Sequence, residues 1–242
     1  MKRSLIFRLL PLFFFIISNG MYAQEENPYE GNPISDIDGN VYKIVMTQQG
    51  VWLAENLRTT KFNDGTAIPL IQDLKAWKEM KSPAYGWFSD DAGYRNTFGA
   101  LYNWYAVETD KLCPAGWHVP SEVEWNEILD YAGGNERSGD SPAKLKEAGT
   151  THWKSPNEGA TNEIYFTALP TGEVSYFYAD EEPGTKTHWW TATEDTNVEP
   201  GSTAPPTNAE IVGLSHNFHS KTAGTFEKES FLPIRCIMDS EE

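Results

Sequence analysis

Positive charge is scarce in this chain. Its 242 residues include 19 Lys and Arg against 35 Asp and Glu, which gives a formal net charge of −16. Nucleic acids and anionic membrane surfaces are bound through clusters of basic side chains. The composition therefore predicts no nucleic-acid partner. Beyond the N-terminal segment, no apolar run approaches the roughly 20 residues of a membrane-spanning helix, so we expect no membrane span in the mature chain.

Sequence signatures of catalysis are also missing. The chain has no Gly-x-Ser-x-Gly string of the kind found in serine hydrolases, and no Gly-rich phosphate loop. Carboxylates are abundant, and a glycosidase needs a facing pair of them. Spacing, however, does not distinguish Glu163, Glu194 or Asp195 from ordinary surface or turn residues. We therefore expect a protein that binds its ligand, and not an enzyme.

The N-terminus has the three-part form of a secretory signal peptide. Lys2, Arg3 and Arg8 give a basic start, residues 9–17 are almost wholly apolar, and Ala23 supplies a small residue at the cleavage site. The apolar run is too short to span a bilayer as a mature helix, and a short membrane anchor is the alternative interpretation.

The sequence accordingly predicts that residues 1–23 are removed and that Gln24 begins the mature protein. Residues 24–35 are polar and are expected to form a flexible leader before the folded domain. The predicted location is outside the cytoplasm, in the periplasm, on the cell surface or in the medium.

Cysteine is almost absent as well. Cys113 and Cys236 are the two in the chain, and an even pair in an exported protein favours a disulfide. Two free thiols are the alternative. A zinc site has little support, because the five histidines show no close pairing with either cysteine.

Turn residues and strand-forming residues predict a hairpin at the start of the domain. Residues 41–46 are rich in β-forming types, residues 48–50 turn the chain, and residues 51–53 pair back. Asp-Gly pairs favour turns with positive φ. Residues 36–40 and 63–65 each contain one and are predicted to be tight turns.

The clearest helix signal follows Pro120. Ser121 suits the N-cap position, and Glu124 three residues later completes a capping box. Apolar residues then recur at the spacing of one helix face, formed by Trp125, Ile128, Leu129 and Ala132. A shorter helical piece is predicted over residues 142–148.

Several longer strings carry a resemblance to a known family. They lie at residues 36–42, 51–57, 63–69, 102–105, 113–120, 124–125, 159–163, 166–170, 190–194 and 235–236. On these strings the chain resembles the Fibrobacter succinogenes major paralogous domain family of secreted and surface bacterial proteins. The resemblance covers residues 36–239, which is nearly the whole mature chain.

The resemblance implies an α+β fold similar to C-type lectin-like domains. That mixed fold has small antiparallel sheets, flanking helices and long irregular loops, and its chain ends lie close together. Domains of the wider group begin a helix after Gly-Trp-x-x-Pro, carry Trp-Thr-x-Thr-Glu late, and close with an Arg-Cys strand. The group also includes oxidases that bind copper through two closely placed cysteines, a chemistry not expected here because Cys113 and Cys236 lie far apart.

The chain departs from the family pattern in two places. The family usually shows two glycines after the Ala-Leu-Pro string, whereas Thr171 and Gly172 follow it here. Residues 199–206 are rich in Pro, Gly, Ser and Thr, where the family usually continues with short aromatic strands. This second departure falls in the region that forms the ligand surface of a lectin-like domain.

The resulting functional hypothesis is a secreted or cell-surface binding module for carbohydrate or another envelope or host component. The alternative is a structural or adhesive domain that binds a protein. Ligand contacts are expected on residues 180–206, because binding residues concentrate on loops. The candidates are Trp189, Trp190, Glu194 and Asp195.

Calcium is the one cofactor considered for this region. The ion takes six to eight oxygen ligands, and carboxylates near the predicted ligand surface could supply several. The candidate ligands are Asp180, Glu181, Glu182, Glu194 and Asp195. A solvated acidic loop is the alternative interpretation.

Overall fold

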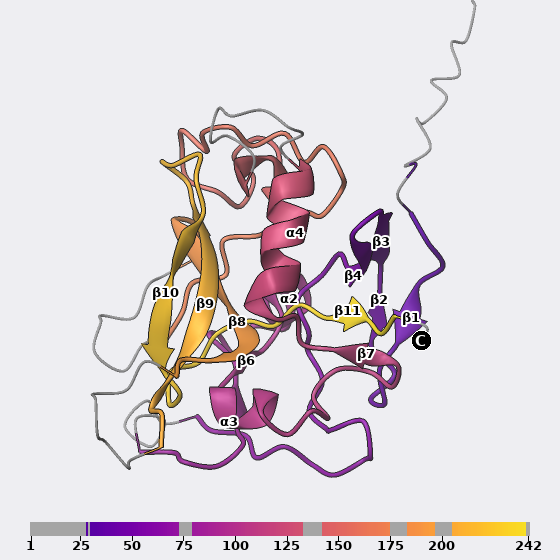
Figure 1. Ribbon diagram of the computed structural model, residues 1–242, viewed down its shortest axis with the longest axis vertical. Helices are drawn as coiled ribbons and strands as arrows, with labels where there is room; N and C mark the ends of the chain where they lie inside the picture. The colour runs from indigo at the N-terminus through magenta and orange to yellow at the C-terminus, as the bar shows by residue number, and fades with distance from the viewer. Residues whose placement is uncertain are drawn as a thin grey trace, which may run out of the picture.

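Figure 1 shows the computed structural model of the chain. Within the residues that it describes, the fold is α+β, as expected, with small antiparallel sheets and a few short helices. None of the helices in this part of the chain combines the length and the apolar character needed to cross a membrane. The structure describes residue 28 and residues 30–72, 79–132, 142–174, 183–196 and 205–240. The predicted signal peptide, residues 1–23, lies outside this part.

The strands form four sheets among the described residues. Two of these sheets are single pairs: β1 (Ile34–Ser35) with β2 (Val41–Tyr42), and β5 (Tyr85–Gly86) with β6 (Leu101–Tyr102). A four-stranded sheet has the order β3-β4-β11-β7 and comprises Ile44–Thr47, Gly50–Leu53, Ile237–Met238 and Trp117–His118. A three-stranded sheet has the order β10-β9-β8 and comprises Thr222–Glu227, Asn208–Ser215 and Lys186–Glu194.

The predicted hairpin is present as β3 and β4. Thr47 pairs with Gly50 beside the turn, and Gly50 has a φ of +118°, a conformation that favours glycine. The strand predicted over 41–46 is interrupted at Lys43, whose backbone N–H donates to Glu55 Oε2 at 3.1 Å. The piece before the interruption is β2, which pairs with β1.

The C-terminal strand β11 lies between β4 and β7. Ile237 pairs with Trp52 on one side and with His118 on the other. The C-terminal strand therefore lies beside the first hairpin (Figure 1). Residues 233–236, including the Arg-Cys pair that the resemblance placed in a closing strand, are buried but precede the strand.

Helix α4 (Glu122–Ala132) confirms the helix prediction after Pro120. The backbone N–H of Ser121 donates to Glu124 Oε2 at 2.8 Å, and the N–H of Glu124 donates to Ser121 Oγ at 3.3 Å. This is the predicted capping box. The predicted apolar face is buried and consists of Trp125, Ile128, Leu129 and Ala132.

The remaining helices are short: α2 (Ala92–Phe98), α3 (Trp104–Val107) and the 3₁₀ helix η1 (Pro142–Leu145). The helical piece predicted over 142–148 therefore ends early. Lys146 leaves the helix because it bridges to Ala168, and its buried ammonium donates to the carbonyls of Glu158 and Ser215, each at 2.8 Å. Between η1 and β8, the described residues contain neither helix nor strand.

Cys113 and Cys236 form a disulfide, as predicted, with their Cα atoms 6.0 Å apart. Both cysteines are buried, and they join the segment before β7 to the residue before β11. The sequence separation is 123 residues. Closing a loop of that length restricts the unfolded chain by about 4–5 kcal/mol on the entropic account.

A cluster of aromatic rings packs between α4 and the two larger sheets. The ring of Trp125 lies 5.1 Å from that of Trp52 and stacks on Trp189 at 5.2 Å. Phe166, from the irregular segment between η1 and β8, meets Trp125 edge-on at 5.9 Å. The irregular segment is thereby tied to the same core as the helix.

Asn56, three residues after the end of β4, forms four side-chain hydrogen bonds in the core. Its Oδ1 accepts from Trp189 Nε1 at 2.9 Å and from Arg235 Nε at 2.8 Å. Its Nδ2 donates at 2.9 Å to the carbonyl of Phe98 and to Thr171 Oγ1. A single amide thus connects β4, α2, β8, the irregular segment and the C-terminal segment.

Arg235 is fully buried beside this amide. Its guanidinium donates to the carbonyls of Leu53 at 2.9 Å, Phe166 at 3.1 Å and Thr167 at 3.1 Å. Burial lowers the pKa of Arg235 to about 9. The group is therefore still charged at neutral pH, and the carbonyls and the Asn56 amide satisfy it.

Asn56→Ala should destabilise the domain by about 3 kcal/mol or more, because buried donors and acceptors left unpaired each cost about 1–3 kcal/mol. Urea denaturation monitored by tryptophan fluorescence measures the change. Asn32→Ala, at an exposed position, is the control and should stay within about 0.5 kcal/mol of the wild type. Equal stability of the two variants would show that the Asn56 amide does not organise the core.

Candidate ligand-binding site

The two tryptophans predicted to contact a ligand lie in the core. Trp189 and Trp190 are both fully buried. The indole N–H of Trp189 donates to Asn56, and that of Trp190 donates to the carbonyl of Tyr102 at 2.9 Å. Neither ring offers a face to a sugar. The prediction that Trp189 and Trp190 contact a ligand is therefore wrong. Both belong to strand β8, which lies in the centre of the molecule.

The predicted acidic contacts at the end of β8 have structural partners. Glu194 forms an ion pair with Lys228, whose side chain is almost buried and whose ammonium lies 4.4 Å above the Trp104 ring. Asp195 continues the pairing of the strand, because its N–H donates to the carbonyl of Asn208 at 3.1 Å. Glu194 therefore neutralises a buried lysine.

The calcium hypothesis is not tested by these contacts. Asp180, Glu181 and Glu182 lie outside the described residues, as does most of the Pro-rich segment 199–206. In the part of the chain that is described, no three His, Cys, Asp or Glu side chains gather as a metal site. Calcium binding stays a prediction.

His118 on β7 joins two carboxylates from different parts of the chain. Its Nδ1 lies 2.6 Å from Asp239 Oδ1, and its Nε2 lies 2.9 Å from Glu124 Oε1. Partial burial would lower the pKa of His118, but the hydrogen bonds to Asp239 and Glu124 outweigh it and raise the pKa. The arrangement connects the helix cap to the C-terminus, and the Ser121 hydroxyl is bonded to Glu124 and not to the imidazole.

A second acid–histidine pair is enclosed in the protein. Glu173 and His188 are both buried and hydrogen-bonded to each other, and Lys186 lies 3.3 Å from Glu173 Oε1. Burial would raise the pKa of Glu173, but the hydrogen bond and charge of His188, with the charge of Lys186, hold it below its ordinary value. The imidazole packs against Gly213, where a Cβ would lie 2.0 Å from it.

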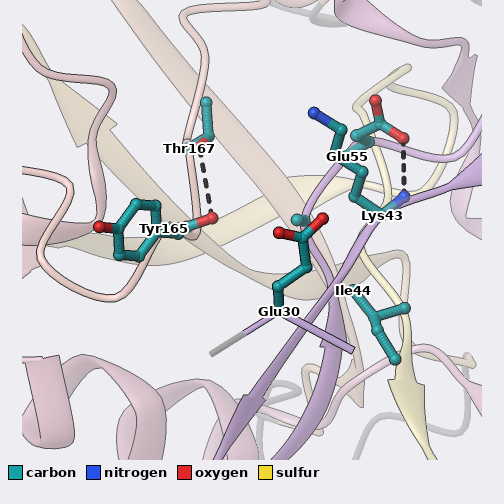
Figure 2. A pocket seen from close by; sticks show the side chains of 7 residues that line it. Glu30, Lys43, Ile44, Glu55, Tyr165 and Thr167 are labelled. Atoms are coloured by element: carbon teal, nitrogen blue, oxygen red, sulfur yellow. Dashed lines mark hydrogen bonds between the residues drawn. The ribbon is translucent and has the colours of Figure 1, made fainter. Parts of the chain in front are cut away.

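A concavity among the described residues that is lined by the exposed residue Tyr165 is shown in Figure 2. We call it the Tyr165 pocket. Its volume is about 290 Å³, and three segments far apart in sequence form its walls. The lining residues are Glu30, Lys43, Ile44, Ala54, Glu55, Tyr165 and Thr167.

The wall that carries Tyr165 is a strained turn. Asn162, Tyr165 and Thr167 all have positive φ, at 55°, 59° and 52°. Such values are uncommon for residues other than glycine, and for a β-branched residue they are outliers. Residues held in this way require support from the surrounding structure, and they concentrate at functional sites.

The support comes from both sides of the turn. Asn162 accepts from the N–H of Thr167 at 2.8 Å and donates to its Oγ1 at 3.0 Å. Thr167 Oγ1 in turn donates to the carbonyl of Tyr165 at 3.2 Å, a bond drawn in Figure 2. From the core, Arg235 binds the carbonyls of Phe166 and Thr167. The turn therefore buries Phe166 and leaves Tyr165 39% exposed.

The opposite wall is polar and carries both signs of charge. Glu55 Oε2 accepts the N–H of Lys43 at 3.1 Å and lies 3.8 Å from Arg58 Nη1. Glu30, from the N-terminal segment, adds a second carboxylate (Figure 2). The pocket is thus lined by Tyr165, an ammonium-bearing residue and two carboxylate-bearing residues, and the Tyr165 ring points away from Lys43 and Glu55 (Figure 2).

Sequence reasoning did not identify this pocket. Glu55 lies inside the string at 51–57, and Tyr165 lies between the strings at 159–163 and 166–170. No local signal predicts positive φ at a tyrosine or a threonine. The asparagine at position 162 is the one residue of the turn whose type tolerates that conformation.

His118→Gln should lower the free energy of unfolding most at a pH between 4.5 and 6.5. These are the ordinary pKa values of Glu and His. The raised pKa of His118 stabilises the fold below 6.5, and this contribution is lost as pH rises through the folded value. The lowered pKa of Glu124 stabilises the fold above 4.5, and this contribution is lost as pH falls through the folded value. The maximum loss should be about 1 kcal/mol, since the pair is partly exposed.

Urea denaturation of the wild type and the variant across this pH range measures the effect. His216→Gln is the matched control, because His216 bonds to the carbonyl of Ser155 at 3.0 Å. A wild-type advantage that keeps growing into alkaline pH would contradict the assignment.

Comparison with known proteins supplies the family. No curated protein and no solved structure matches the chain. The sequence model of the Fibrobacter succinogenes major domain matches residues 45–238, which confirms the resemblance found over residues 36–239. The match covers more than half of the chain and includes β4, α4, the strained turn and the disulfide. The chain therefore belongs to the Fibrobacter succinogenes major domain family.

Proposed function

We propose that this chain is an exported, non-catalytic binding domain that takes a carbohydrate into the Tyr165 pocket. The observation that carries the proposal is the exposed ring of Tyr165, fixed by a strained turn beside Glu30 and Glu55. Binding sites typically combine apolar or aromatic surface with a few placed polar groups. The aromatic ring suits the C–H face of a sugar, and the carboxylates suit its hydroxyl groups.

The finer fold assignment, a C-type lectin-like arrangement, is part of this proposal. It is supported by the family and by the position of β11 beside the first hairpin. The stretch between η1 and β8, irregular in its described residues, also fits the long loops of that fold.

Export is also part of the proposal. It is supported by the basic and apolar pattern of residues 1–23. The disulfide between Cys113 and Cys236 adds support, because disulfides persist mainly in oxidising compartments.

Calcium enters the proposal only as a second ligand. Glu194 is paired with Lys228, so Asp180, Glu181 and Glu182 would have to supply most of the oxygen atoms. Titration calorimetry of calcium into the full chain should give a binding heat that Asp180→Asn with Glu181→Gln and Glu182→Gln removes. An identical heat in the triple variant would exclude these ligands.

A protein-binding, adhesive role is the second candidate. Val41 on β2, Met46 on β3 and Met238 on β11 are each about half exposed, at 54%, 50% and 43%. These strands belong to two sheets, the β1-β2 pair and the four-stranded sheet, and apolar side chains exposed on both favour a protein partner over a sugar. Loss of partner binding in a Met46→Ser variant, without any glycan binding by the wild type, would favour this candidate.

Glycan array screening of the purified full chain tests the carbohydrate proposal, followed by calorimetry with the best ligand. Tyr165→Ala should lower the affinity for that ligand by about tenfold or more, as expected for a central aromatic contact. The oligosaccharide should be recovered uncleaved, because the proposal includes no chemical step.

Phe218→Ala is the matched control. Phe218 is also an exposed aromatic residue, at 59%, but it does not line the pocket. The control should bind as the wild type does. Equal affinity of the Tyr165→Ala variant and the wild type would rule out the pocket as the site.

A further inference from the structure

A second pocket, of about 270 Å³, is lined in part by Arg58 and Thr60 from the segment that follows β4. It shares no lining residue with the Tyr165 pocket. We call it the arginine pocket. Its lining residues are Asp38, Asn40, Arg58, Thr60, Trp87, Ala92, Arg95 and Asn96. Two arginines in one small pocket contrast with the acidic composition of the chain.

Arg58 is oriented by neutral groups. Its guanidinium carbon lies 4.5 Å above the ring of Tyr42, and its Nη2 donates to the carbonyl of Val41 at 2.6 Å. The carboxylate of Glu55 lies 3.8 Å from Nη1, which is beyond hydrogen-bond distance. The cation is therefore fixed in position but only weakly neutralised.

Arg95, on α2, is held in a similar way. Its guanidinium carbon lies 5.1 Å above the ring of Trp87, and its Nε donates to the carbonyl of Ser89 at 3.3 Å. Asp90 lies 2.5 Å from Nη2, but the Asp90 side chain is 87% exposed. Such an exposed pair contributes little, so an anionic ligand can take its place.

The one carboxylate that lines the pocket is already engaged. Asp38 accepts from the N–H of Thr60 at 2.6 Å and from its Oγ1 at 2.9 Å. Lys61 lies 3.0 Å from the other oxygen of Asp38. Asp38 therefore shapes the wall without neutralising Arg58 or Arg95.

These contacts define the ligand. Arginine forms forked hydrogen bonds with planar carboxylates, and the remaining polar side chains, Asn40, Thr60 and Asn96, suit hydroxyl groups. The volume lies just below the roughly 300–1,000 Å³ of sites for drug-sized ligands, which suits one sugar ring. The net charge of −16 opposes multiply charged ligands.

We propose that the arginine pocket binds a single carboxylate-bearing sugar unit, a uronic acid, with Arg58 and Arg95 holding the carboxylate. The neighbouring amides and the Thr60 hydroxyl contact the ring hydroxyls. This site is separate from the Tyr165 pocket, and its test does not depend on the carbohydrate proposal made for that pocket.

The test titrates the full chain with glucuronate, galacturonate, glucose and glucose 6-phosphate. Calorimetry gives the affinity, and the indole N–H resonance of Trp87 in NMR reports the site. At least one uronate should bind and shift that resonance, whereas glucose should not. Arg95→Gln should weaken uronate binding by about tenfold or more, since hydrogen bonds to charged groups are the stronger ones.

Three further variants keep the test decisive. Asn96→Asp adds a negative charge at an exposed position of the pocket, so it should weaken uronate binding without affecting folding. Lys111→Gln removes one positive charge from an exposed pair with Asp64 outside the pocket, and it should bind as the wild type does. Tyr165→Ala should also leave uronate affinity unchanged.

Three results would overturn the proposal: no response of Trp87 to either uronate, equal uronate affinity in Arg95→Gln and the wild type, or tighter binding of glucose 6-phosphate. Failure of the Tyr165 pocket to bind glycans is a separate result. It would remove the function proposed for that pocket and leave the arginine pocket standing.

Discussion

The buried contact between Arg235 and Asn56 is the constraint on which the rest of the structure depends. Burying a guanidinium without a buried carboxylate is costly unless its donors find acceptors. Here the Asn56 amide and the carbonyls of Leu53, Phe166 and Thr167 supply them. Because these acceptors come from separate segments, the charge can be satisfied only when the segments are assembled together.

This contact also fixes the surface. Arg235 holds Phe166 and Thr167 by their carbonyls, so the turn that presents Tyr165 has little freedom to relax. In the sequence, the buried Asn56 lies between Glu55 and Arg58. Glu55 lines the Tyr165 pocket, and Arg58 lines the arginine pocket. The same short segment thus anchors the core and forms a wall of both pockets. Under the proposed function, a ligand would meet a preformed surface and would not have to order it, which lowers the cost of binding.

Local patterns in the sequence predicted the parts of the fold that local chemistry determines. Helix α4 follows from a capping box and an apolar face, and the β3–β4 hairpin follows from its turn residues. Trp189 could not be placed in this way, because whether an indole is buried depends on α4 and Trp125, which are distant in sequence. The Tyr165 pocket escaped prediction for the same reason: the support for its positive φ comes from Arg235.

A domain with so little regular structure must satisfy its backbone through side chains. Between η1 and β8, the carbonyl of Ala168 accepts from Trp153 Nε1, and those of Glu147 and Gly149 accept from Asn157. Buried polar backbone groups require such partners wherever sheet or helix bonds are missing. Trp153 and Asn157 are themselves buried in these roles. The function proposed for this chain therefore uses exposed neighbours, such as Tyr165 beside the buried Phe166. Exposed positions of this kind can vary while the buried ones preserve the fold.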